Sequence, residues 1–441
     1  MLPKDSHTWV PLTPQGKREP VPIIQKAEGE FIFTSEGKAY LDGIASWWTM
    51  IHGHRHPKLM AALVDQTKKL DHVMLGGLLH EEGEELSKLL LQKLDNQFAK
   101  VYFSDNGSNS VEIALKVSVH SWALRKRPTK TSFVIFSTSY HGDSLGAMNV
   151  SGSNVFNSPY NALRFPVEEC IAPNCHACPW KKKPKNCSLE CLEQVEDILK
   201  SKAENIAGIL IEPLVFGAFG MIFYESKVLK GLRKLADKYE VYLIFDEVFT
   251  GMGRLGEFTA AQKAEVNPDL ICLAKGLTGG VLALAVTLVK ESIYRDFVGE
   301  DLHQAFFHAH TMTGNPLACR LGIESIRLWE EQISITQKEH PLAKELERLR
   351  DSLISWESSQ KISHLRSQGG ILAFEISGTD IAEDEYLLEE GRKFCRNLWD
   401  KGLFLRPLGN TIYLTPPNIT SSKSFEIVSK ALGESLKELQ I

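Results

Sequence analysis

The sequence predicts an α/β fold in which helices cover both faces of a mainly parallel β-sheet. From about residue 100 to residue 290, short apolar runs alternate with amphipathic stretches of helical length. Such short, uniformly apolar runs are typical of strands buried on both faces, and the long spacing between them is typical of parallel connections. The runs are VYFSD, SFVIFSTSYHG, IAGILIEP, VYLIFDEV, DLICLAK and LALAVTLV.

The two ends of the chain have a different pattern from its middle. Residues 1–50 contain short strand-like segments and turns. Residues 318–441 begin with helical patterns and end in the strand-like segments GGILAFEIS and TIYLTPP. We therefore expect both ends to form one smaller α+β domain beside a large domain of residues 51–317. At 441 residues, the chain is long enough for this division.

Composition and charge restrict the class of partner. Apolar residues make up 43% of the chain and charged residues 24%, as in ordinary soluble proteins. A formal net charge of −5 argues against binding to nucleic acid or to an anionic membrane. The longest apolar stretch, near residues 281–289, is well short of the roughly 20 residues that span a bilayer, and residues 1–20 lack the apolar core of a signal peptide. We expect a cytoplasmic protein with small-molecule partners.

Polar side chains gather at the ends of the predicted strands. In open parallel sheets, ligands bind outside the carboxyl ends of the strands. Because these ends meet at one edge of the sheet, we expect the side chains that follow them to form one site. They are Asp105, Tyr140, Glu212, Asp246 and Lys275.

Lys275 ends the apolar run DLICLAK and is followed at once by Gly276. A lysine becomes a nucleophile when burial lowers its pKa, and its typical covalent chemistry is imine formation with an aldehyde. The alternative is a lysine whose stem is buried while its ammonium group reaches water.

Asp246 ends the run VYLIFDEV at the same edge of the predicted sheet. A carboxylate in this position can pair with a protonated pyridine nitrogen, and that charge allows a pyridoxal ring to accept electrons. An aspartate that only caps a helix is the alternative.

The segment SDNGSNSVEIALKVSVHSWALR begins an amphipathic helix at Gly107, Ser108 and Asn109. The free N–H groups and the dipole of a helix N-terminus form a phosphate site. Tyr140 can stack on a flat ring and Glu212 ends a further strand, although either residue can equally fill a packed cleft.

Together, these segments resemble the class III aminotransferases, which are fold-type I enzymes dependent on pyridoxal 5′-phosphate (PLP). The resemblance covers nearly the whole chain, and IFDEVFTGMGRLG with LAKGLTGG is specific for the class. Within the class, SWW and RPLGNTIYLTPP are most similar to the adenosylmethionine-8-amino-7-oxononanoate aminotransferases of biotin synthesis. The resemblance implies a seven-stranded, mainly parallel sheet with a smaller α+β domain. It also rests on YLDGIASWWTMIHGHRHP, HVMLGGLLHE, DNGSNSVEIALK, SYHGDSLGAM, LIEPLVFGAFGM and TGNPLAC.

The resemblance implies a role for each matched residue. Lys275 would bind the cofactor covalently and later move a proton, Asp246 would bind its pyridine nitrogen, and Tyr140 would stack on its ring. Thr311 would reach the phosphate from the second subunit of a homodimer. The remaining implied cofactor ligands are Gly107, Ser108 and Glu212.

The implied acceptor is 8-amino-7-oxononanoate, a keto acid with a long aliphatic chain, and the implied product is 7,8-diaminononanoate. Trp47 and Trp48 would line its cleft, and the ring face of either would attract the sulfonium of an adenosylmethionine donor. Arg406 would bind the carboxylate through two parallel hydrogen bonds. Core packing is the alternative for the tryptophans, and a surface salt bridge is the alternative for Arg406.

Two departures from the resemblance affect the amino donor. Leu12 stands where the adenosylmethionine-using enzymes usually have tyrosine, and Ala309 with His310 stands where they usually have Gly-Pro. Adenosylmethionine is the expected donor and lysine a possible substitute. Ala309 is nevertheless counted among the expected substrate-binding residues.

A third departure is a cysteine-rich insert at residues 170–191. Its C-x2-C-x8-C-x3-C spacing suits a tetrahedral Zn²⁺ site, although an iron–sulfur cluster also uses thiolates. Four reduced cysteines without a metal are the alternative. Because four protein ligands leave no open position, any metal would be structural. The expected ligands are Cys175, Cys178, Cys187 and Cys191.

Three other functions compete with this interpretation. Another ω-amino-acid or diamine transaminase, or an aminomutase, would keep the cofactor residues and change only the cleft. A non-catalytic regulator that binds PLP or a metal would rely on the cysteine insert, and the presence of both Lys275 and Asp246 disfavours it.

Overall fold

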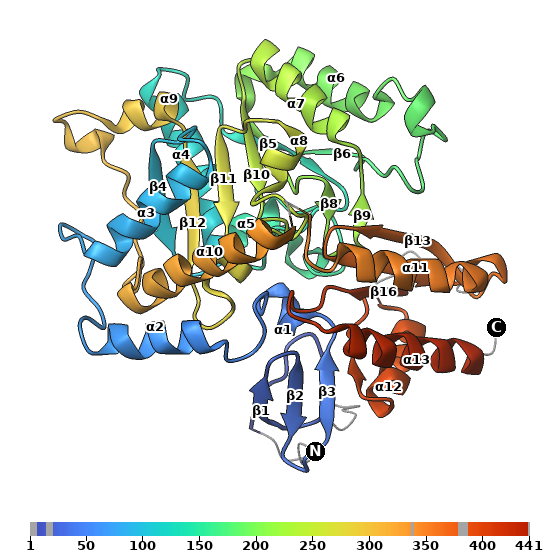
Figure 1. The fold of residues 1–441 in the computed structure, drawn as a ribbon. Coiled ribbons are helices and arrows are strands. Elements are labelled where there is room, and N and C mark those ends of the chain that lie inside the picture. The colour runs from blue at the N-terminus through green and yellow to red at the C-terminus, as the bar shows by residue number, and fades with distance from the viewer. Residues whose placement is uncertain (1–6, 15–20, 337–338, 378–386, 440–441) are drawn as a thin grey trace.

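The computed structural model describes residues 7–14, 21–336, 339–377 and 387–439, and its centre is a seven-stranded sheet (Figure 1). The strand order is β4-β12-β11-β10-β7-β5-β6. Strand β12 is antiparallel to both of its neighbours, and every other pair is parallel. This confirms the predicted fold class. The strands are β4 (Lys100–Ser104), β5 (Ser132–Phe136), β6 (Glu168–Cys170), β7 (Ile206–Ile211), β10 (Tyr242–Asp246), β11 (Leu270–Leu273) and β12 (Ala285–Val289).

Each of the six apolar runs forms one of these strands. Strand β6 was not predicted, because Glu168 and Glu169 interrupt its apolar pattern. The antiparallel direction of β12 was not predicted either, since a strand buried on both faces reads the same in both directions.

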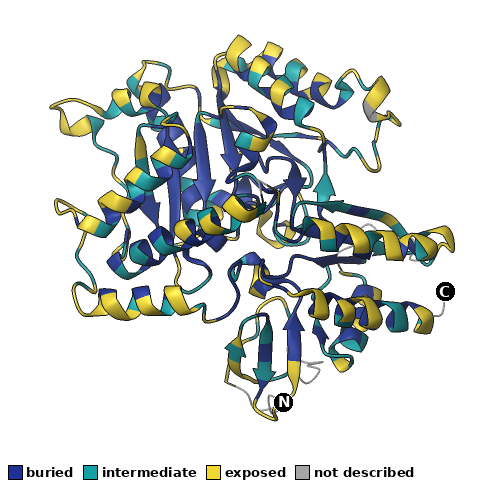
Figure 2. Cartoon of the chain, viewed as in Figure 1, coloured by how far each residue is buried: buried dark blue, intermediate teal, exposed yellow. Residues whose placement is uncertain are grey.

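Both faces of the central sheet are covered. Along β10, Tyr242 and Ile244 belong to one apolar cluster, whereas Leu243 and Phe245 belong to the other. Helix α4 covers the first face, and helices including α3, α6 and α7 pack on the second. The inner strands of the sheet are therefore almost entirely buried, and the edge strands β4 and β6 less so (Figure 2). The helices are α3 (Glu81–Lys93), α4 (Gly107–Leu124), α6 (Glu193–Lys202) and α7 (Ser226–Lys238).

Segments from the two ends of the chain share a second sheet, in the order β1-β2-β3-β15. Strand β15 runs parallel to β3 and places Phe404 opposite Asp42. A further antiparallel sheet, β13-β14-β16, lies nearby (Figure 1). The strands are β1 (Ile24–Glu28), β2 (Phe31–Thr34), β3 (Ala39–Asp42), β13 (Ile362–Gln368), β14 (Ile371–Ile376), β15 (Leu403–Phe404) and β16 (Thr411–Leu414).

The two ends thus meet as expected, while the predicted domain boundaries at residues 50 and 317 stay a prediction. Within the described ranges, no helix has the length and apolar character needed to cross a bilayer. The remaining elements are α1 (Ala45–Trp48), α2 (Pro57–Thr67), α5 (Leu145–Asn149), β8 (Val215–Phe216), β9 (Ile222–Phe223), α8 (Ala260–Ala264), α9 (Glu291–Tyr294), α10 (Pro316–Thr336), α11 (Ala343–Ser358), α12 (Glu389–Asp400) and α13 (Ser422–Glu438).

Candidate active site

The carboxyl edge of the central sheet brings the expected site residues together. Asp246 is the last residue of β10 and pairs with Cys272 of the neighbouring β11. Lys275 opens the short 3₁₀ helix that follows β11, and Glu212 follows β7 on the other side of β10. All three side chains line one cleft with a volume of about 520 Å³.

Lys275 lies at the base of this cleft with a backbone φ of 45°. Its Nζ atom is 4.7 Å from the ring centre of Trp48. Desolvation lowers the pKa of Lys275, and the nearby Arg254 guanidinium lowers it further, whereas Asp246 and Glu212 act in the opposite direction. A lowered pKa increases the fraction of free amine, which is the nucleophilic form.

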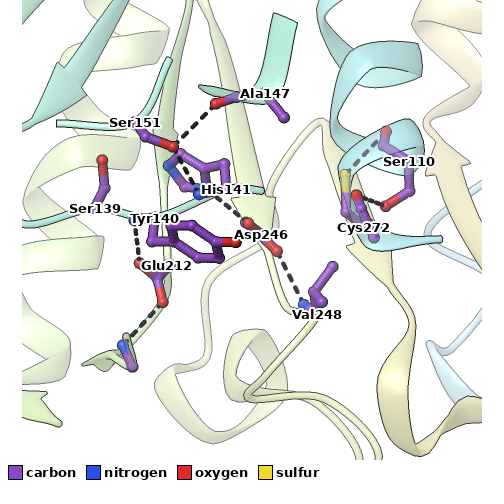
Figure 3. Close-up of polar contacts among 12 residues, drawn as sticks. Ser110, Ser139, Tyr140, His141, Ala147, Ser151, Glu212, Asp246, Val248 and Cys272 are labelled. Carbon is purple, nitrogen blue, oxygen red and sulfur yellow. Dashed lines mark hydrogen bonds and ion pairs between the residues drawn. The ribbon is translucent and has the colours of Figure 1, made fainter. Parts of the chain in front are cut away.

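Asp246 is held by contacts on both of its carboxylate oxygens (Figure 3). The Val248 N–H donates to Oδ1 at 3.0 Å, and Nδ1 of His141 lies 2.6 Å from Oδ2. The backbone N–H of His141 in turn donates to the Ser151 hydroxyl at 2.9 Å. Sequence reasoning missed His141, although its place directly after Tyr140 was the available signal.

Glu212 anchors the loop that carries Tyr140 (Figure 3). Its carboxylate accepts hydrogen bonds from the N–H groups of Tyr140 and Gly217, each at 2.9 Å. Burial raises the pKa of Glu212 to about 7. The Tyr140 ring lies 5.9 Å from the Phe156 ring, and both side chains line the cleft.

The N-terminus of α4 opens into the same cleft through Gly107 and Ser108. The Asn106 side chain caps the helix by accepting a hydrogen bond of 3.1 Å from the Asn109 N–H. A Cβ atom added to Gly107 would stand only 2.7 Å from Val248 Cγ1. The site therefore requires glycine there, and a backbone this close to the cleft can present its N–H groups to an anion.

The cleft wall away from these polar groups is apolar. Trp47 is 44% exposed and lines the mouth, whereas Trp48 is buried and packs 4.4 Å from the Phe249 ring. The guanidinium of Arg406 lies over the Trp47 ring at 4.6 Å. The other apolar side chains of the lining include Leu12, Phe156, Leu282, Leu284 and Leu408.

The structure does not bring Thr311 or Ala309 to this cleft within one chain. Both residues are exposed on a turn outside its lining, beside His310, whose Nδ1 lies 2.8 Å from Asp105 Oδ2. The prediction that Thr311 acts in the site of a second subunit therefore concerns a dimer and not the single chain. It stays a prediction.

The predicted metal site in the cysteine insert finds no support. The described residues contain no group of three or more His, Cys, Asp or Glu side chains placed to hold a metal ion. Cys191 is instead buried in the apolar core, and Cys175 packs against that core. The four cysteines of the motif are free thiols.

Comparison with known proteins agrees with this geometry. The family described as "Aminotransferase class-III" matches residues 13–436. The chain is a class III aminotransferase. It is 36% identical over 437 residues to the adenosylmethionine-8-amino-7-oxononanoate aminotransferase of Geobacter sulfurreducens, covering 98% of this chain and 95% of that protein. The enzyme of the same name from Synechococcus elongatus is 35% identical, with 99% of this chain and 100% of that protein covered.

Solved structures of related enzymes have the same fold. An amine transaminase from an uncultivated Pseudomonas species, solved in its PLP-bound form, superposes with a TM-score of 0.92 at 26% identity and covers 99% of both chains. The adenosylmethionine-8-amino-7-oxononanoate aminotransferase of Methanocaldococcus jannaschii superposes with a TM-score of 0.89 at 29% identity, covering 99% of this chain and 98% of that one.

The residues of this class III aminotransferase fit PLP, the cofactor that family membership supports. The molecule has an aldehyde, a pyridine nitrogen and a phosphate, and the cleft offers one suitable group for each. Lys275 supplies an amine of lowered pKa, Asp246 a buried carboxylate, and the glycine-lined N-terminus of α4 an anion site.

Proposed function

We propose that this class III aminotransferase transfers an amino group to 8-amino-7-oxononanoate, giving 7,8-diaminononanoate for biotin synthesis. The observation that carries the proposal is the stacking of the Arg406 guanidinium on Trp47, which itself lines a cleft with many apolar side chains. A long aliphatic chain with a terminal carboxylate needs both features. The names of the relatives at 35% and 36% identity support the same acceptor.

When bound, PLP supplies an aldehyde that holds the amino group and a ring that takes up electrons. Lys275 Nζ takes the proton from the substrate carbon that carries nitrogen and later returns it, because burial lowers its pKa and so increases the fraction of free amine. Asp246, held by His141 and the Val248 N–H, keeps a negative charge where a ring nitrogen would be protonated.

The remaining groups orient and bind. Glu212 fixes the Tyr140 backbone, so the phenol ring stands at the side of the cleft. Gly107 and Ser108 would hold the phosphate through helix N–H groups. Arg406 is the carboxylate partner of the acceptor, and the surrounding apolar wall excludes water from the alkyl chain.

The amino donor we propose is adenosylmethionine, with lysine as the second candidate. Trp47 supports a sulfonium donor, because it lines the cleft and is 44% exposed. Leu12 lines the same cleft and offers no hydrogen bond to a donor, so this position does not itself favour adenosylmethionine.

We also propose that the enzyme acts as a homodimer in which Thr311 enters the site of the partner subunit. The turn that carries Thr311 is flanked by exposed apolar side chains, Phe307 at 70% and Met312 at 48%. Leu79, exposed at 74%, lies on a segment tied to this turn by His80, whose Nε2 is 2.7 Å from Gly314 O. A surface this apolar is typical of an interface.

The test is a comparison of amino donors with the purified PLP-loaded enzyme. Adenosylmethionine, lysine and alanine are added separately, and the loss of the cofactor absorbance band is recorded. We expect adenosylmethionine to bleach the band and subsequent 8-amino-7-oxononanoate to restore it, with 7,8-diaminononanoate detected by mass spectrometry. Bleaching by lysine alone would reassign the donor. Restoration by other keto compounds but not by this acceptor would indicate an ω-amino-acid or diamine transaminase.

A further inference from the structure

The two tryptophans of the cleft lie on a left-handed helical turn. All four residues of α1, Ala45, Ser46, Trp47 and Trp48, have positive φ angles, of 47°, 45°, 67° and 73°. For residues other than glycine, each such angle costs free energy through a clash of Cβ with the following carbonyl. A run of four persists only when surrounding contacts hold it, and such runs gather at functional sites.

The contacts that hold this turn centre on Asp42, which is fully buried. Its Oδ2 accepts a hydrogen bond of 2.7 Å from the Ser46 hydroxyl and lies 2.9 Å from His54 Nε2. Its Oδ1 accepts a hydrogen bond of 3.4 Å from the Ile44 N–H. The carboxylate thus binds the turn just before its start, at Ile44, and in its middle, at Ser46.

The other end of the turn is held by Arg254. Its guanidinium donates to the carbonyl of Trp48 at 2.9 Å, and its side chain is buried. Between these two anchors, the Trp48 N–H donates to Ile44 O at 2.8 Å and the Thr49 N–H to Ala45 O at 2.9 Å. The turn is therefore fixed at both ends but contains no glycine.

Asp42 also fixes the turn relative to Arg406. It ends strand β3, and its register partner in β15 is Phe404, shortly before Arg406. The Gly43 N–H donates to Phe404 O at 3.1 Å and continues this pairing. The two segments therefore leave the sheet side by side, and Trp47 comes to lie under the Arg406 guanidinium.

We propose that Asp42 is a positioning residue for acceptor specificity: it holds the left-handed turn Ala45–Trp48 so that Trp47 faces Arg406. Without the Asp42 hydrogen bonds, the turn relaxes toward ordinary backbone angles. The Trp47 ring then moves away from the Arg406 guanidinium, and the proposed site for the acceptor carboxylate changes shape. Lys275 and the cofactor residues lie on other elements, and Trp48, whose ring is 4.7 Å from Lys275 Nζ, keeps its separate hydrogen bond from Arg254. The inference rests on the proposed acceptor and deepens it.

The test compares three variants of the PLP-loaded enzyme. Asp42→Asn weakens the grip, and Ser46→Ala removes one hydrogen bond while keeping the unfavourable φ. Ser46→Gly removes the same bond but adopts a positive φ without a clash. Asp269→Asn is the control, because the Asp269 carboxylate also accepts a backbone hydrogen bond, from the Leu243 N–H at 2.8 Å, but it pairs with Arg233 and Lys290 and lies outside the cleft lining.

Calorimetry measures the dissociation constant of nonanoate, a probe with the alkyl chain and carboxylate of the acceptor, and fluorescence measures that of PLP. We expect Asp42→Asn and Ser46→Ala to weaken nonanoate binding about five- to tenfold while PLP binding stays within about twofold. Ser46→Gly should lie between wild type and Ser46→Ala, and Asp269→Asn should equal wild type. Wild-type nonanoate binding in Asp42→Asn and Ser46→Ala would overturn the inference, as would an equal loss of PLP affinity.

A crystal structure of Ser46→Ala separates this inference from the proposed function. If the wild type does not bind nonanoate, the proposed acceptor is wrong. The crystal structure of Ser46→Ala then tests the positioning role of Asp42 by itself. Displacement of Trp47 from Arg406 would support the positioning role. An unchanged left-handed turn with Trp47 still under the guanidinium would overturn it.

Discussion

The carboxylate of Asp246 lies 2.6 Å from Nδ1 of His141, with both side chains buried at the carboxyl edge of the sheet. A buried carboxylate in such a short contact keeps a fixed orientation, and Val248 holds its other oxygen. The pair therefore presents a charge of fixed position to whatever binds in front of it. Substitution of Asp246 by asparagine, a neutral side chain of the same shape, therefore tests the effect of the charge without changing the packing.

Asp246→Asn should lower kcat about a hundredfold to a thousandfold, because a fixed charge facing the reacting group contributes on this scale. PLP should still bind, since the phosphate and Lys275 contacts remain. Stopped-flow absorbance of the half-reaction with the amino donor measures the effect. Asp269→Asn serves as the control and should keep the wild-type rate. A half-reaction of wild-type speed in Asp246→Asn would refute the role of Asp246.

The amine of Lys275 should react with acylating or arylating reagents at a pH below its ordinary pKa of 10.5, because burial lowers that pKa. The neutral amine is the reactive form, so reactivity rises as the pH rises through the pKa. In cofactor-free enzyme, trinitrobenzenesulfonate labelling followed by peptide mapping gives the midpoint for this lysine alone.

Two substitutions should move this midpoint in opposite directions. Arg254→Met removes a cation and should raise the pKa of Lys275, whereas Glu212→Gln removes an anion and should lower it. Shifts of the opposite sign would show that the charges do not act on the amine as the geometry indicates. Lys275→Ala should lose both the labelling and all turnover while still binding PLP.

Glu247 should stabilise the folded protein, because its carboxylate accepts hydrogen bonds from buried backbone N–H groups. Its carboxylate accepts hydrogen bonds from the Ala260 and Ala261 N–H groups at 2.6 and 2.7 Å, and it is completely buried. In Glu247→Gln, one of these N–H groups faces an amide NH₂, so the free energy of unfolding should fall by about 1–3 kcal/mol. Urea unfolding measures this. The exposed Glu331→Gln should change stability by no more than about 0.5 kcal/mol.

Phe307→Asp should convert the proposed homodimer into monomers and reduce activity, because a charge replaces a large apolar side chain at the proposed interface. Light scattering after gel filtration measures the mass. Ile335→Asp, at a residue exposed to 81% near the end of α10, is the matched control and should remain dimeric. A monomeric wild type, or a dimeric Phe307→Asp variant, would contradict the proposed assembly.

Arg406→Ala should raise KM for the keto acid about tenfold or more while leaving the half-reaction with the donor nearly unchanged, since it removes a carboxylate partner and not a cofactor contact. Steady-state kinetics with both substrates varied gives the two constants. Arg348→Ala, which removes an exposed arginine of α11, is the control. An equal loss of rate in both half-reactions would indicate that Arg406 acts on the donor or the cofactor and not on the keto acid.

The sequence predicted that Glu212, Asp246 and Lys275 meet at one sheet edge, because strand ends are local signals. Apolar runs mark β10 and β11, and Asp246 and Lys275 follow directly from where those runs stop. Convergence on one edge then follows from parallel topology. The roles expected for Arg406 and the tryptophans came from the match to a family with specific motifs, since no local pattern distinguishes them from core or surface residues, and these roles stay predictions.

What the sequence did not predict depends on contacts between distant segments. The closeness of His141 to Asp246, the hold of Arg254 on the Trp48 carbonyl and the grip of Asp42 on Ser46 need tertiary structure. The cysteine spacing did not establish a metal site either, because spacing alone does not say whether Cys191 faces a common point or the apolar core. Left-handed backbone at Ala45–Trp48 has no sequence signal, since glycine is absent there.

The parallel contact between β3 and β15 has a consequence for biosynthesis. Strand β3 leaves the ribosome early, whereas its partner emerges only near the end of translation. A nascent chain can complete the sheet edge that surrounds Lys275 long before Arg406 exists to face Trp47. The nascent chain should therefore be able to bind the cofactor before it can select a substrate. Both abilities are present only once the full chain is released.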